Sequence, residues 1–362
     1  MKAHILILLL LVVTFSFCDE CKLKLNKEYP EPEEQVDVKE IAALVVKTIN
    51  ETYVQKGEFV RRDAHPKAHG CPRAIFKVLD NIPSEFRHGI FTNSSQSYKA
   101  YIRFSNGSPS VNHDLRPDSR GFALKLLGVH GKKLLEDEQD ATTQDFVGAN
   151  KPEFFLSTTS DYLTFFKMVR RGGLDLIKWL IGGQKFREVN AARKFIFTVI
   201  GNVLSTQYFS ATPYRLGPEV TVKWSVQPVD CYTGVPVSDR LPGMSNDYLT
   251  ERLKESLNAE ETCFDFLVQK QENACEQPME DPVTEWTTPF VRLARITVPV
   301  QELDQSEEGK LFCENLSFSP WHSLEAHQPL GNVNRARKVV YRATSSFRHA
   351  QNHEPRVEPK EW

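Results

Sequence analysis

The order of strand-like and helix-like segments is the feature that most constrains the fold of this chain. Alternating apolar and polar residues predict strands over 101–104, 121–126, 220–226 and 290–298. Between the first two and the last two of these strands, residues 160–206 carry their apolar side chains at helical spacing. No repeat of fixed period and no long linker divides the 362 residues. The sequence therefore predicts one α+β domain built around an antiparallel sheet.

The N-terminal residues, 1–18, have the features of a secretory signal peptide. A basic residue at position 2 precedes an apolar run over 5–13 that ends in small residues before an acidic pair. The run is shorter than the roughly 20 residues needed to cross a bilayer, so a membrane anchor is the less favoured interpretation. We expect a secreted, extracellular protein without a stable membrane span, organised as an extended arm (19–34), a folded domain (35–350) and a loose C-terminal tail (351–362).

Six cysteines would remain after cleavage, an even number in a compartment where disulfides persist. They are Cys21, Cys71, Cys231, Cys263, Cys275 and Cys313, and their spacing leaves the pairing of up to three bridges open. Acceptor triplets for N-glycosylation begin at Asn50, Asn93, Asn106 and Asn315. These features predict a disulfide-bonded glycoprotein.

The charge balance argues against a nucleic-acid partner. A formal net charge of −2 provides no general basic field for neutralising phosphates. The Gly-x-Ser-x-Gly elbow, the His-Glu-x-x-His zinc helix and the Gly-rich phosphate loop are also absent from the sequence. The chemistry must therefore come from other residue clusters.

Four segments rich in histidine, asparagine, arginine and aromatic residues carry the strongest signal. They are 61–71, 101–123, 144–155 and 208–218, and in order and spacing they resemble the haem-dependent catalases. Residues 318–322 and 329–337 resemble the closing part of the short catalase-related proteins, which include bacterial catalase-like peroxidases and the allene oxide synthase domains of corals. The resemblance implies an antiparallel β-barrel with flanking helices that encloses a haem b.

On one face of the haem, the resemblance implies a catalytic pair, His65 and Asn150. Histidine can take a proton from one peroxide oxygen and return it to the other near neutral pH, while Asn150 would hold the peroxide. Ser105 or Asn106 would orient the imidazole. His69, by contrast, resembles nothing catalytic, and Asp118 with Arg120 is interpreted as a structural ion pair.

The resemblance also assigns residues that hold the haem. Phe155 would stack near the macrocycle, and Arg62, Arg103 and Arg215 would bind the propionates through charge-assisted hydrogen bonds. Tyr208 would be the axial iron ligand, a role for which Tyr214 is the competitor.

One departure from the family pattern concerns that ligand. Catalases place an arginine one helical turn before the ligating tyrosine. In this sequence, the residue one turn before Tyr208 is Leu204. Pro213 would also interrupt a helix running on to Arg215. The partner of the tyrosinate is therefore left open.

These residues predict a haem-dependent oxidoreductase that acts on hydrogen peroxide or organic hydroperoxides, as a peroxidase or a catalase. One alternative is rearrangement of a fatty-acid hydroperoxide, with Phe165, Phe166 and Trp179 lining an apolar tunnel or belonging to the core. Another is a haem-binding protein without activity. Without the interlocking extensions of typical catalases, a monomer or homodimer is expected.

Overall fold

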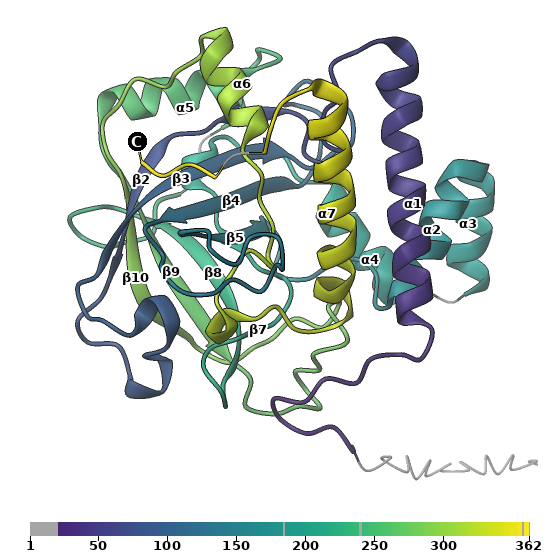
Figure 1. Cartoon of the computed structure of the whole chain (residues 1–362), viewed down its shortest axis with the longest axis horizontal. Coiled ribbons are helices and arrows are strands. Elements are labelled where there is room, and N and C mark those ends of the chain that lie inside the picture. The colour runs from purple at the N-terminus through teal and green to yellow at the C-terminus, as the bar shows by residue number, and fades with distance from the viewer. Residues whose placement is uncertain (1–20, 184, 239–240, 357, 362) are drawn as a thin grey trace, which may run out of the picture.

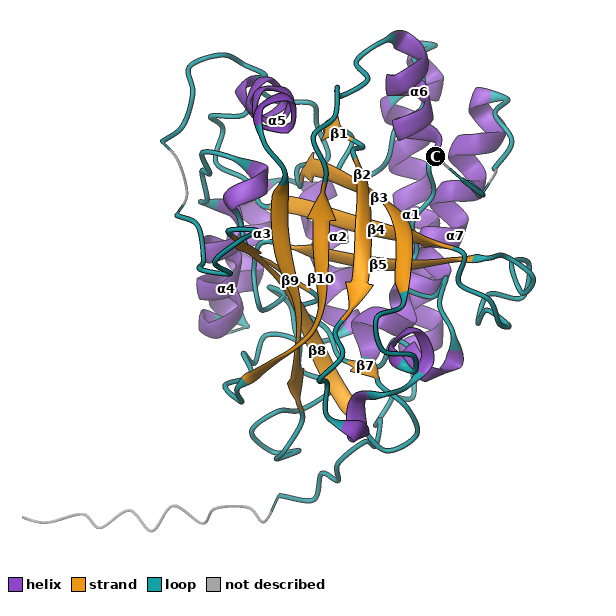
Figure 2. Cartoon of the chain, turned by 90° about the vertical axis from the view of Figure 1, so that its left-hand side faces the viewer, coloured by secondary structure: helices purple, strands orange, loops and turns teal. Residues whose placement is uncertain are grey.

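The computed structural model describes residues 21–183, 185–238, 241–356 and 358–361. The predicted signal peptide, 1–18, lies outside the described residues. Helices and antiparallel strands are mixed as predicted (Figures 1 and 2). The helices are α1 (Glu34–Thr52), α2 (Thr159–Arg171), α3 (Gly173–Gly182), α4 (Phe186–Ile196), α5 (Tyr248–Ala259), α6 (Glu307–Asn315) and α7 (Asn332–Asn352).

Within the described residues, ten strands form one antiparallel sheet. They are β1 (Ala68–Gly70), β2 (Arg73–Val78), β3 (Ser97–Asn106), β4 (Arg120–Leu127), β5 (Thr143–Ala149), β6 (Tyr208–Phe209), β7 (Tyr214–Arg215), β8 (Thr221–Val229), β9 (Thr262–Lys270) and β10 (Phe290–Val298). The order is β1-β3-β2-β10-β9-β8-β6-β5-β4. In addition, β7 pairs with β8 and β3 pairs with β4. The predicted antiparallel sheet is confirmed, and its description as a barrel stays a prediction.

The main core lies on one side of the strands because their side chains alternate in direction. Phe122, Leu124 and Leu126 of β4 join the core together with Phe146 of β5. The intervening residues of β4, such as Ala123, point the other way, toward α7. The small size of Gly121 and Ala123 leaves space between this surface and the helix.

Helices cover that second surface in successive layers. Helix α7 lies beside the sheet, α1 packs on α7, α2 packs on α1, and α3 is outermost (Figure 1). Val38, Ile41, Val45 and Ile49 of α1 recur at helical spacing and are buried.

Three cysteine pairs lie at disulfide distance: Cys21 with Cys275, Cys71 with Cys313, and Cys231 with Cys263. The expectation of three bridges is thereby confirmed. Two of the pairs join residues more than 240 positions apart, with sequence separations of 254 and 242. They therefore tie the N-terminal part of the chain to its C-terminal third. No helix in the described part of the chain is long and apolar enough to span a membrane.

Candidate functional site

A cavity of about 120 Å³ lies between α7 and strands β3, β4 and β5. Its walls combine apolar groups, a histidine, a tyrosine and several arginines. The lining includes Arg62, His65, Arg103, Ser105, Gly121, Phe122, Ala123, Val147, Gly148, Phe318, Tyr341, Thr344, Ser345 and Arg348. Four residues that the sequence analysis selected, His65, Ser105, Arg62 and Arg103, therefore share one cavity.

His65 is held in a fixed position at the edge of the sheet. Its φ of 61° lies in the left-handed region, an unfavourable conformation for a residue with a side chain. Nδ1 lies 3.1 Å from the Ser105 hydroxyl, and a Cβ at Gly121 would overlap the ring. Asn106, the other candidate for orienting the ring, instead contacts His69 through Oδ1 at 2.9 Å.

The environment keeps this imidazole neutral. Burial, with a contribution from the nearby Arg103 guanidinium, lowers the pKa of His65 from 6.5 to about 4. The backbone of Asn106 also forms a hydrogen bond with the ring, and this bond opposes the lowering of the pKa. In the tautomer whose Nδ1–H donates to the Ser105 hydroxyl, Nε2 is the nitrogen that can accept a proton.

Three arginines gather at one end of the cavity around a single carboxylate. Arg62 donates to Glu314 Oε1 at 2.6 Å, Arg103 donates to Oε2 at 3.3 Å, and Arg348 donates to the Glu314 carbonyl at 2.8 Å. Burial first, and then the charge of Arg62, lowers the pKa of Arg103 and of Arg348 to about 9. The excess of positive charge would stabilise a ligand carboxylate.

Arg103 has further hydrogen-bonding capacity. One of its terminal nitrogens donates to the His65 carbonyl at 2.9 Å, while its buried Nε has no hydrogen-bond partner among the described residues. A buried donor of this kind is costly unless a ligand satisfies it. The arginine cluster is therefore suited to an anionic group inside the cavity.

The sequence analysis did not identify Tyr341, which lines the cavity from α7. Arg337 lies one helical turn earlier on the same helix face, and its Nη2 donates to the Tyr341 hydroxyl at 3.2 Å. The same nitrogen donates to the Val147 carbonyl of β5 at 3.3 Å. This pair has the arginine-to-tyrosine spacing that the resemblance requires. An arginine four residues before a tyrosine is therefore the sequence pattern by which Tyr341 could have been identified.

Tyr208 lies elsewhere. It is fully buried on β6, donates to the Val203 carbonyl at 2.9 Å, and stacks on Phe122 with ring centroids 5.1 Å apart. It does not line the cavity, and its competitor Tyr214 does not either. Residues 208–215 contain two short strands in place of a helix, in line with the effect expected of Pro213.

Asn150, Phe155 and Arg215 are also not among the lining residues. Asn150 Oδ1 accepts a 2.7 Å hydrogen bond from the Arg120 backbone, which closes the end of the β4–β5 ladder. Phe155 packs on Phe165, and Arg215 extends the sheet edge on β7. The structure therefore brings no asparagine or glutamine side chain to this cavity from the described residues.

The three aromatic residues considered for an apolar tunnel are likewise absent from the lining. Phe165 and Phe166 contact each other on α2, with ring centroids 5.9 Å apart. Trp179 lies on α3, in the outermost helical layer. The predicted pairing of Asp118 with Arg120 is present, with an N–O distance of 3.7 Å.

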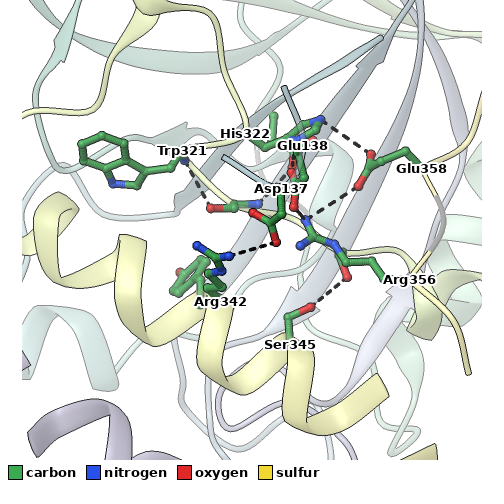
Figure 3. A network of polar contacts seen from close by, with 12 residues as sticks. Asp137, Glu138, Trp321, His322, Arg342, Ser345, Arg356 and Glu358 are labelled. Atoms are coloured by element: carbon green, nitrogen blue, oxygen red, sulfur yellow. Dashed lines mark hydrogen bonds and ion pairs between the residues drawn. The ribbon is translucent and has the colours of Figure 1, made fainter. Parts of the chain in front are cut away.

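A second polar cluster joins the C-terminal segment to the sheet (Figure 3). Glu138, His322 and Glu358 offer ligand atoms within 4.8 Å of one another, a type of set that can hold a metal ion. Both carboxylates are already paired, Glu358 with Lys125 at 2.6 Å and Glu138 with Arg356. The cluster therefore works as an ion-pair network, and the tail that was expected to be loose is anchored through Glu358.

Comparisons with known proteins agree with this architecture. No family model and no curated protein matches the chain. Among solved structures, a fungal catalase aligns with a TM-score of 0.65 and 16% identity over 82% of this chain and 60% of its own. Catalase A from Saccharomyces cerevisiae has a TM-score of 0.60 and 16% identity, covering 84% of this chain and 63% of its own.

A bacterial catalase aligns with a TM-score of 0.59 and 17% identity over 87% of this chain and 64% of its own. The chain thus spans between 60% and 64% of the length of these three catalases. Identities this low establish the fold alone, because one fold can support many functions. The protein has a catalase-like fold of helices and antiparallel sheet.

Proposed function

We propose that this protein binds haem between α7 and the sheet and reacts there with hydroperoxides, that Tyr341 would ligate the iron, and that His65 would act as the base. The observation that carries the proposal is that Tyr341, whose hydroxyl accepts a hydrogen bond from Arg337, and the neutral His65 line one cavity. Tyr341 takes the place of Tyr208 in the proposal because Tyr208 is buried outside that cavity.

The chemistry of the lining fits haem. A phenol oxygen can ligate ferric iron, the arginine cluster can bind propionates, and Ala123, Val147 and Phe318 offer apolar surface to a macrocycle. The present volume of about 120 Å³ is below the ~300–1,000 Å³ typical of ligand pockets. Binding would therefore require the walls of the cavity to move apart.

When bound, haem supplies a redox-active iron that accepts the oxidising equivalents of a hydroperoxide. Arg337 donates a charge-assisted hydrogen bond to the Tyr341 oxygen, and this bond is stronger to a phenolate than to a phenol. His65 Nε2 takes the proton from the hydroperoxide O–H. It returns that proton to the other oxygen as the O–O bond breaks, so that an alcohol or water leaves.

Within this class, a peroxidase is favoured over a catalase. Asn150 was expected to hold the peroxide, and its side chain instead binds the Arg120 backbone. The lining offers no other amide side chain from the described residues. The same observation favours the second candidate, a haem-binding protein without activity.

The experiment is the ultraviolet–visible spectrum of haem-loaded protein for Tyr341→Phe and for the matched control Tyr208→Phe. We expect Tyr341→Phe to lose the tyrosinate spectrum or the haem, and Tyr208→Phe to keep both. His65→Ala should retain haem and slow peroxide cleavage by about 10²–10⁴-fold. An unchanged Tyr341→Phe spectrum would overturn the ligand assignment. A haem spectrum that peroxide leaves unaltered would favour the candidate without activity.

A further inference from the structure

The outermost helix, α3, turns apolar side chains away from the protein. Leu174, Ile177 and Ile181 are spaced three and four residues apart, which places them on one helix face. Their exposed fractions are 76%, 53% and 66%. The helix of a globular protein normally turns such a face inward. This face has no covering element among the described residues.

Apolar residues continue onto the neighbouring segment. Phe186 opens α4 and Phe197 follows it, and each is 72% exposed. Figure 1 shows α3 at the outer edge of the molecule, beyond α2 and α1, and α4, the next helix in the chain, contacts α3. We call Leu174, Ile177, Ile181, Phe186 and Phe197 the α3 patch.

Positive charge surrounds the α3 patch. Residues 167–197 contain eight lysines or arginines and two acidic residues. Some are neutralised, as Lys167 is by Glu40 at 2.7 Å and Arg170 by Glu51 at 2.9 Å. In the described part of the chain, exposed Arg171, Lys178 and Arg193 have no recorded ion pair. These three keep their full charge beside the apolar side chains.

This combination selects among possible partners. A second copy of the chain would contact the α3 patch through a two-fold symmetric interface. Such an interface places the three positive side chains of one copy near the same three side chains of the other. Like charges facing each other oppose such an interface. A negatively charged bilayer suits both the apolar side chains and the positive charge. Its interior accepts the apolar side chains, and its headgroups pair with the cations.

We propose that the α3 patch docks the protein on a bilayer containing anionic phospholipid, with α3 lying in the plane of the interface. The ten-residue α3 is much too short to span a bilayer and long enough to lie along its surface. This inference rests on exposed side chains far from the cavity and does not depend on haem binding.

The test is flotation of the full-length protein with vesicles of phosphatidylcholine containing about 30% phosphatidylserine, with pure phosphatidylcholine vesicles in parallel. We expect binding to the anionic vesicles that weakens as salt is raised. The triple variant Leu174→Ser, Ile177→Ser, Ile181→Ser should lower binding by at least about tenfold, because the inserted apolar area is lost.

The matched control replaces three apolar residues elsewhere that are between 56% and 60% exposed, Val36→Ser, Val111→Ser and Val300→Ser, and should bind as the parent does. A second variant, Arg171→Glu, Lys178→Glu, Arg193→Glu, should abolish the preference for anionic vesicles. Equal binding by the Leu174/Ile177/Ile181 variant would overturn the proposal. So would sedimentation showing that this variant dissociates a dimer of the parent protein while no form binds vesicles.

Discussion

Gly121 illustrates how a single backbone position determines the geometry of the candidate site. The residue has no side chain, so the His65 ring and the Ser105 hydroxyl can lie directly against β4. A methyl group at this position would overlap both. The left-handed backbone of His65 leaves the ring little freedom to move aside without a larger rearrangement.

Gly121→Ala is therefore expected to displace His65 while leaving the α7 side of the cavity in place. We expect the haem spectrum to be retained and the rate of peroxide cleavage to fall by at least about tenfold, as part of the general-base contribution is lost. The measurement is stopped-flow kinetics of the haem-loaded protein. Gly182→Ala, where nothing lies within 4 Å, is the control. A parental rate in Gly121→Ala would show that His65 position does not limit the reaction.

Among individual residues, the predicted ones that line the cavity are those with a second lining residue nearby in the sequence. His65 and Arg62 lie in one short segment, and Arg103 and Ser105 in another. Tyr341 was missed because its identification depends on a partner four residues earlier and on the packing of α7 against the sheet. Tyr208 and Asn150 have side-chain types suited to the chemistry. Their burial and backbone contacts, which no local pattern reveals, place them elsewhere.

The elements with strong periodicity were predicted close to their observed bounds. The strand predicted over 290–298 corresponds to β10, and the helical spacing predicted over 160–206 corresponds to α2, α3 and α4. Helix α7 was not predicted, although it is the longest helix in the described residues. Its inward face includes Asn334, Arg337 and Arg348, which are buried. Because these buried side chains are polar, the sequence does not mark this face of α7 as a buried helix face.

The C-terminal segment after α7 depends on one carboxylate for its position. Glu358 pairs with buried Lys125, which Asp145 also contacts at 2.7 Å. Burial opposes ionisation of Glu358, but the charges of Lys125 and His322 outweigh it and lower its pKa from 4.5 to about 2. The ionised form therefore stabilises the fold above about pH 4.5, and this contribution is lost as the pH falls toward 2.

Glu358→Gln should release the segment while leaving Lys125 paired with Asp145. We expect the free energy of unfolding to fall by about 1–3 kcal/mol, because a buried charge loses one of its two partners. Limited proteolysis should cut the variant near its C-terminus faster than the parent protein. Glu361→Gln, on an exposed side chain in the same segment, is the control. Equal proteolysis of Glu358→Gln and the parent would contradict the anchoring role.

For the whole molecule, several histidines are buried in their neutral form. Burial, and then the neighbouring His88, lowers the pKa of His327 to about 3, and burial lowers the pKa of His69 to about 4. His327 Nε2 accepts a 3.0 Å hydrogen bond from the Ile90 backbone, which requires that nitrogen to be unprotonated. These side chains are spread between the main core and the β3 edge, so their protonation affects the fold as a whole.

Acidification should therefore destabilise the protein in a defined window. Below about pH 6.5 the unfolded chain binds protons at these histidines and the folded chain does not. The free energy of unfolding consequently falls by up to about 1.4 kcal/mol per pH unit for His327 alone. The decline should continue until the pH reaches about 3, the folded pKa of His327.

Urea denaturation at successive pH values, with the disulfides intact, measures this slope. His327→Gln should flatten it, because glutamine can accept the Ile90 hydrogen bond without titrating, whereas His113→Gln, at an exposed position, should leave it unchanged. A slope in His327→Gln equal to that of the parent would mean that other groups, the carboxylates of the ion-pair networks among them, determine the acid sensitivity.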